Sequence, residues 1–245
     1  FLFCAVGALF LPHIGIYGYI ADYCISPSGQ WWGRPFFNMG MRFSFTLAIA
    51  TLAGIIFQRD KLKFGDKLFC SQEITLLLFL VLIWFLFLTS GDTVGRYVVT
   101  DHPSIKFTKI VVFCLMTTHV ITDLKKLNGL FWVLVVVSLM LGIKAWDIPY
   151  SAFVSGRLEG IGGADFSESN FFAAFMAAML PFIGIQFLRG NLYSKLVCFA
   201  SGAFTANAVV LCRSRGAFLG LAVGGLIACI FAPERHRKSI FILLI

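Results

Sequence analysis

Two short polar groups interrupt an otherwise apolar chain, and both contain arginine. They are residues 157–170, which include Arg157, Gly160 and Asn170, and residues 213–216, which read Arg213-Ser214-Arg215-Gly216. We call them the two arginine islands. A guanidinium group stays charged at physiological pH and presents a rigid fork of donors that suits phosphate oxygens. Arginines at the ends of apolar helices therefore predict contact with a lipid-linked phosphate or pyrophosphate.

The composition excludes a soluble globule. Of the 245 residues 59% are hydrophobic and only 13% are charged, and the mean hydropathy is +0.88. Soluble domains carry about 25% charged residues. The net charge of +8 does not indicate nucleic-acid binding, because the basic residues fall mostly between apolar runs. There they determine topology and contact membrane lipids.

Metal and cofactor motifs are not found in the sequence. Seven cysteines are scattered without CxxC or metal-ligand spacing. There is no Walker loop, dinucleotide fingerprint or Ser-His-Asp set. We therefore expect neither a metal nor a cofactor.

Apolar runs predict an all-α, polytopic transmembrane helix bundle. A spanning helix needs about 20 mostly apolar residues. The runs lie near 2–21, 38–57, 73–90, 106–122, 129–146, 169–188, 195–212 and 216–232, with a truncated one from 239. This predicts about eight complete spans in a single transmembrane domain over 1–245. Because the chain starts at Phe1 and stops inside an apolar run, we expect it to be the N-terminal part of a longer protein.

Lysine and arginine in the connections set the orientation. The connections 58–72, 123–128, 189–194 and 233–238 hold ten of these residues, whereas 22–37, 91–105, 147–168 and 213–215 hold five. The first set is predicted to be cytoplasmic. Both arginine islands then lie on the outer face, which is the periplasm in a Gram-negative host.

Arg157 is the first candidate for anion binding. It lies in a connection that is rich in glycine, where backbone amides can approach an anion closely. Ser167 or Ser169 is expected to cap the next helix, whose positive dipole end would face the same side. The alternative is an arginine that extends to phospholipid head groups without a catalytic role.

Further basic residues lie near the same predicted face. Arg215 and Arg213 are two residues apart and cannot share a helix face, so we expect one of them to turn inward and the other outward. Arg42 and Lys109 lie just inside the outer ends of their helices, where contact with head groups is the simpler interpretation. Among the histidines, His102 is the one placed in an outer connection to act as a base.

Several of these residues resemble the motifs of the O-antigen ligase and polymerase family. The matching residues are Arg157-x-x-Gly160, Asn170 at a helix start, Pro181 inside that helix, and Ser214-Arg215-Gly216-Ala217. The N-terminal part is similar to the exosortase-associated O-glycosylation ligases in Pro12-x-x-Gly15, Ser26-Pro27-x-x-x-x-Trp32-Gly33 and Pro35-Phe36. The resemblance is strongest over 129–232. It departs at Glu168-Ser169, where the family usually has Asp-Pro or a similar pair, and at Ser28, where the branch has His.

The resemblance implies a membrane glycosyltransferase of the GT-C type in the bacterial inner membrane. Such an enzyme takes a glycan from undecaprenyl pyrophosphate and passes it to lipid A-core, a polysaccharide or a protein hydroxyl. Arg157 and Arg215 would be the catalytic residues. The substrate-binding residues would be Arg213, Gly160, Asn170, Ser214, Gly216 and Arg42. The family's catalytic His lies beyond the ninth helix, so this chain alone is expected to be inactive.

Two other functions are alternatives. A lipid-linked oligosaccharide flippase would line a central cavity with charges near mid-membrane, and mid-span charges are nearly absent here. A peptidoglycan polymerase of the shape-and-division type is chemically related, although the Ser-Arg-Gly pattern favours the ligase.

Overall fold

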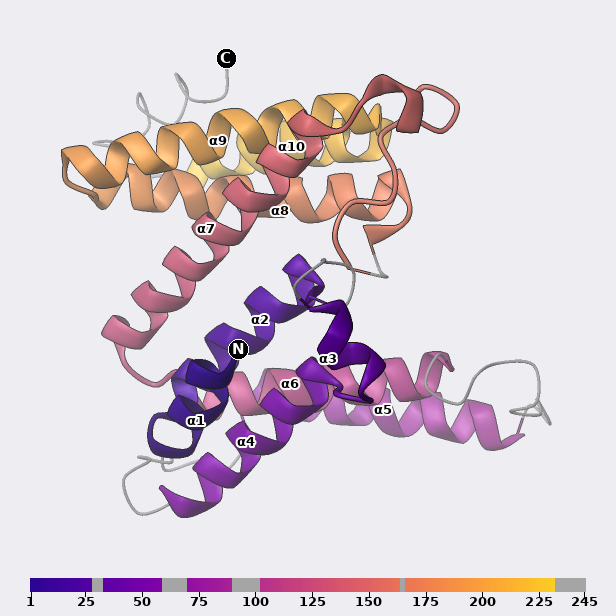
Figure 1. Ribbon diagram of the computed structural model, residues 1–245, viewed down its shortest axis with the longest axis vertical. Coiled ribbons are helices and arrows are strands. Elements are labelled where there is room, and N and C mark those ends of the chain that lie inside the picture. The colour runs from indigo at the N-terminus through magenta and orange to yellow at the C-terminus, as the bar shows by residue number, and fades with distance from the viewer. Residues whose placement is uncertain (28–32, 59–69, 90–101, 164–165, 232–245) are drawn as a thin grey trace. The chain divides into compact units, whose positions relative to one another are not determined.

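The computed structural model describes residues 1–27, 33–58, 70–89, 102–163 and 166–231 (Figure 1). These residues form helices and connecting turns, with one isolated β-bridge and no strand among them. The helices are α1 (Leu2–Phe10), α2 (Pro12–Ile25), α3 (Arg34–Asn38), α4 (Phe43–Phe57), α5 (Ser71–Thr89), α6 (Pro103–Val120), α7 (Leu124–Asp147), α8 (Ser169–Arg189), α9 (Leu192–Cys212) and α10 (Arg215–Phe231). A short 3-10 turn, Tyr150–Ala152, follows α7. The predicted ninth helix from 239, Ser28 and Trp32 lie outside the described residues.

Four of these helices, α5, α7, α8 and α9, are long and apolar enough to cross a membrane. Helices α4 and α10 are apolar but shorter. The chain is therefore all-helical where it is described, with the composition of a membrane protein.

The predicted first span, 2–21, is not one helix. It breaks at Leu11 into α1 and α2. Leu11 has φ −137° and ψ 85°, outside the helical region. Proline has no N–H to donate and disfavours helical geometry at the preceding residue, so Pro12 starts a new helix instead of continuing α1.

The predicted second span, 38–57, also begins later than expected. Asn38 ends the short helix α3, and α4 begins only at Phe43. Between them Gly40 has φ +86°, a left-handed conformation that a helix cannot contain.

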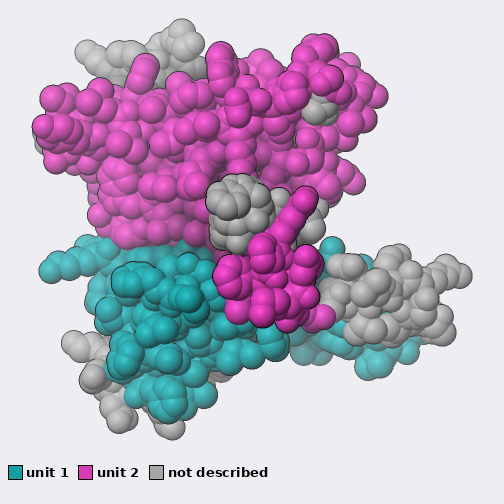
Figure 2. Space-filling view, viewed as in Figure 1, with its two compact units in different colours: residues 1–18, 45–127 teal, residues 19–44, 128–245 magenta. Residues whose placement is uncertain are grey.

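The chain divides into two compact units (Figure 2). Unit 1 is Phe1–Gly18 with Phe45–Leu127, and unit 2 is Tyr19–Ser44 with Asn128–Ile245. In unit 1, α5 and α6 pack together, and Trp84 Nε1 donates to Thr108 Oγ1 at 3.0 Å between them.

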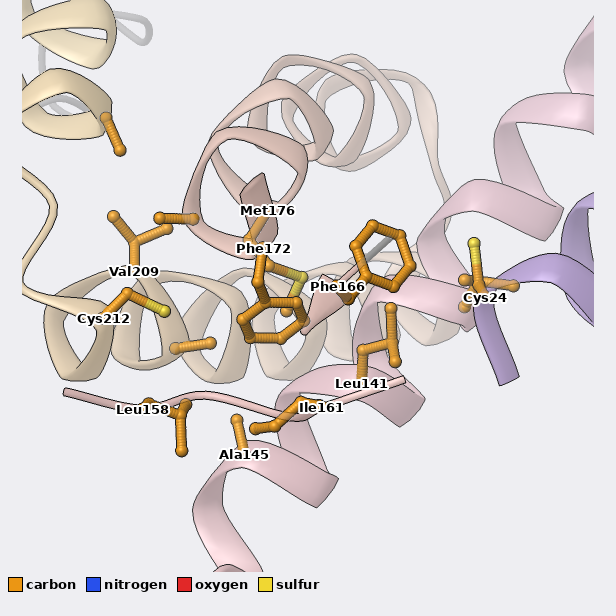
Figure 3. Close-up of a cluster of buried hydrophobic side chains, with 14 residues drawn as sticks. Cys24, Leu141, Ala145, Leu158, Ile161, Phe166, Phe172, Met176, Val209 and Cys212 are labelled. Carbon is orange, nitrogen blue, oxygen red and sulfur yellow. The ribbon is translucent and has the colours of Figure 1, made fainter. Parts of the chain in front are cut away.

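Unit 2 is held by a core that several helices and a connecting loop supply (Figure 3). Phe172 and Met176 come from α8, and Cys212 comes from α9. Leu158 and Ile161 belong to the loop between α7 and α8, yet each is at most 2% exposed. That loop is therefore packed into the core of the unit.

Candidate functional site

The first arginine island begins in a tight hairpin. Val154 N–H donates to the Arg157 carbonyl at 3.0 Å, and Arg157 N–H donates back to the Val154 carbonyl at 2.9 Å. Ser155 and Gly156, which connect them, have φ +51° and +72°. Two successive left-handed residues are typical of the type I′ turn that joins short antiparallel segments. The hairpin fixes the backbone of Arg157, whose side chain is exposed.

The rest of the loop packs against the core of unit 2. Leu158, next to Arg157, is fully buried in the core. Gly160 has φ +72°, and its N–H donates to the Ser167 carbonyl at 3.1 Å. The role of Gly160 here is conformational, because a left-handed turn is costly for other residues.

The second arginine island joins α9 to α10. Arg213 ends α9 in the left-handed conformation, with φ +48° and ψ +38°. Ser214 is buried, and its Oγ accepts from Ala217 N–H at a long 3.5 Å. Arg215 is the first residue of α10, and its side chain is exposed, as is Gly216.

The structure brings the two islands together. Leu158 N–H donates to the Leu211 carbonyl at 3.2 Å, which ties the first island to the end of α9. A Cβ added to Gly156 would lie 3.0 Å from Arg213 Nη1, so the guanidinium of Arg213 rests against the tip of the hairpin. Segments far apart in the sequence thus form one arginine-bearing end of unit 2.

The electrostatics of this end favour an anion. Arg157, Arg213 and Arg215 are exposed, and within the described ranges no ion pair or side-chain hydrogen bond joins them to a protein acceptor. Helices α8 and α10 both begin here, and helix N-termini carry partial positive charge.

A hollow of about 330 Å³ lies on α7 and α9, lined by Trp146, Ala203, Phe204 and Asn207.

Other predicted site residues make none of the contacts described above between the islands. Asn170 is exposed on the first turn of α8. Arg42 is exposed in the segment between α3 and α4, and the described contacts between the islands do not involve it. Lys109 belongs to α6 of unit 1.

The capping of α8 differs from the expectation. The N-cap of α8 is Glu168, and no side chain among the described residues caps that helix, so the prediction of a Ser167 or Ser169 cap is wrong. Ser169 is instead buried against the core, with 3% of its surface exposed. His102 caps α6 in unit 1, where its Nδ1 accepts from Ser104 N–H at 3.3 Å.

Sequence reasoning missed Asp22. Its side chain is only 8% exposed, and Ser44 Oγ donates to its Oδ2 at 2.5 Å. Among the described residues its Oδ1 has no hydrogen-bond partner. Burial raises the pKa of this carboxyl, and the hydrogen bond from Ser44 partly opposes that change. Asp22 stands at the end of an apolar run, and nothing in the sequence there indicates that its side chain is buried.

The end of α2, just after Asp22, lies close to the loop of the first island. A Cβ on Gly163 would lie 2.7 Å from the Tyr23 carbonyl oxygen. Lys144 of α7 donates to the Ile25 carbonyl at 3.5 Å. The loop therefore also packs against the C-terminal carbonyls of α2.

No protein-family model, curated protein or solved structure matches this chain. No group of three or more His, Cys, Asp and Glu able to hold a metal is found among the described residues.

Proposed function

We propose that this protein is a membrane glycosyltransferase that uses undecaprenyl pyrophosphate as its glycan donor. The acceptor is lipid A-core, a growing polysaccharide or a protein hydroxyl. The proposal includes about eight transmembrane spans of the GT-C type in the bacterial inner membrane, with the arginine end of unit 2 on the periplasmic side. The observation that supports it is the meeting of the two arginine islands through Leu158 and Leu211.

In this reaction Arg157 and Arg215 bind the pyrophosphate. The acceptor oxygen forms a bond to the anomeric carbon of the glycan, while the bond from that carbon to the pyrophosphate oxygen breaks. Negative charge accumulates on the departing pyrophosphate. Fixed cations directed at that charge stabilise the transition state more than the ground state, which is what accelerates a reaction.

The proton of the acceptor hydroxyl goes to a base. The family resemblance implies a histidine beyond the ninth helix for this role. Arg157, Arg213 and Arg215 are cations and cannot serve as that base. The site described here therefore binds the donor and stabilises the leaving group.

The position of the charges favours an enzyme over a flippase. The three arginines gather at helix ends and on a surface loop of unit 2. A flippase that carries its substrate across the bilayer would place such charges near the middle of its spans.

Glycan transfer by the full-length protein tests the proposal. Replacing Arg157 or Arg215 by alanine should abolish transfer, while the amount of protein in the membrane stays the same. Arg189→Ala is the matched control, because Arg189 is an exposed arginine at the opposite end of α8. Full activity of both site variants would refute the assignment. Full activity of Arg215→Lys would refute bidentate recognition.

A further inference from the structure

Arg213 holds a backbone conformation that suits another residue better. It ends α9 with φ +48°. That left-handed position at a helix end is normally occupied by glycine, and sometimes by asparagine, because a Cβ there is strained. An unfavourable conformation persists where the surrounding structure fixes it, often at a functional site.

The side chain of Arg213 lies against the hairpin of the first island. Its Nη1 is 3.0 Å from the position that a Cβ on Gly156 would take. Gly156 has φ +72° and stands directly before Arg157. The guanidinium therefore packs on the turn that sets the direction of Arg157.

The position of Arg213 at a helix end favours its charge. It lies at the C-terminus of α9, where unpaired carbonyls carry partial negative charge that a cation stabilises. Arg215, by contrast, opens α10 at a positive helix end. The two arginines therefore lie at helix ends of opposite partial charge, although they are only two residues apart.

We propose that Arg213 is a positioning residue, which holds the 154–157 hairpin against the end of α9 and so orients Arg157. This differs from the sequence expectation, in which Arg213 contacts the substrate. The effect of Arg213 on donor binding rests on the proposed function. Its effect on the position of the hairpin does not.

Hydrogen exchange in the purified full-length protein tests the contact without any donor. The key variant is Arg213→Gly, because glycine suits the left-handed position and should preserve the end of α9 while removing the side chain. The amides of Val154 and Arg157, which make the hairpin bonds, should exchange at least about tenfold faster. The melting temperature should be unchanged or higher. Arg215→Ala is the control and should leave these amides unaffected. Unchanged exchange in Arg213→Gly would overturn the proposal.

A double-mutant cycle tests the link to Arg157. The binding of undecaprenyl pyrophosphate is measured for Arg157→Ala, Arg213→Gly and the double variant. If Arg213 acts through Arg157, the double variant should bind as weakly as Arg157→Ala alone, within about twofold. If the loss of donor affinity in the double variant equals the product of the two single losses, Arg213 binds the donor itself. That result would overturn the positioning role.

The two measurements separate the two claims. If none of these variants alters donor binding, the proposed function fails, and with it the part that Arg213 would play in catalysis. Faster exchange in Arg213→Gly would then still show that Arg213 holds the hairpin.

Discussion

Leu158 and Leu211 are joined by a backbone hydrogen bond of 3.2 Å, from the N–H of the first to the carbonyl oxygen of the second. Leu211 is one residue from the end of α9, where a carbonyl has no partner within its own helix. Leu158 supplies that partner and is itself fully buried. Arg157 precedes it, so the bond places the first island beside the second.

Truncating Leu158 should loosen this attachment. Leu158→Ala removes a side chain from the core cluster and is expected to cost about 2–5 kcal/mol of unfolding free energy. Leu196→Ala is the control, since Leu196 on α9 is 59% exposed. Thermal unfolding in detergent should show a large decrease in melting temperature for Leu158→Ala and little change for Leu196→Ala. Equal changes would show that the loop is not part of the core.

Gly142 should be intolerant of a methyl group. Helices α7 and α9 approach closely there, because a Cβ on Gly142 would lie 2.7 Å from Phe204 Cβ and 2.9 Å from the Phe204 carbonyl carbon. Backbone atoms cannot move aside cheaply, so Gly142→Ala is expected to cost about 1–3 kcal/mol.

Gly184 of α8 is the matched control, with no atom within 4 Å of an added Cβ. Alanine there should stabilise the helix by about 0.5–1 kcal/mol. The two substitutions should therefore move the melting temperature in opposite directions. A stabilised Gly142→Ala variant would contradict the close packing of α7 on α9.

Asp22 should make stability depend on pH. Because burial raises the pKa of its carboxyl, the folded protein holds this proton at pH values where the unfolded chain has lost it. Stability must then fall as pH rises from the ordinary aspartate value through the raised one. Above that window the folded protein carries the full cost of a buried carboxylate.

Asp22→Asn removes that cost. Its melting temperature should exceed the wild-type value at neutral pH, and the difference should shrink as pH falls below the ordinary aspartate pKa. Asp147→Asn, at an exposed position, should show no such dependence. A neutral-pH loss of stability in Asp22→Asn would contradict the argument.

The positions of most helices could be predicted from apolar runs alone. Helices α7 to α10 lie where the sequence places them, because such runs end at glycine, proline or charged residues. Pro12 also indicates the break at Leu11, although a criterion based only on the length of the apolar run misses it. The Ser155-Gly156 pair is a turn signal that fits the hairpin.

The contacts between the islands could not be predicted. The left-handed conformation of Arg213 has no sequence signal, because arginine is not a residue that favours it. The bond from Leu158 to Leu211 depends on tertiary packing between segments distant in the chain. The same is true of the buried Asp22 and its bond with Ser44.

The central claim is that Arg157 and Arg215 together bind a diphosphate, and equilibrium binding tests it most directly. Undecaprenyl pyrophosphate and undecaprenyl monophosphate are titrated into the full-length protein in lipid nanodiscs, for the wild type, Arg157→Ala, Arg215→Ala and the control Arg189→Ala. We predict that the wild type and Arg189→Ala prefer the diphosphate, and that each site variant binds it at least about tenfold more weakly and loses much of that preference. Wild-type affinity for the diphosphate in both site variants would contradict the account.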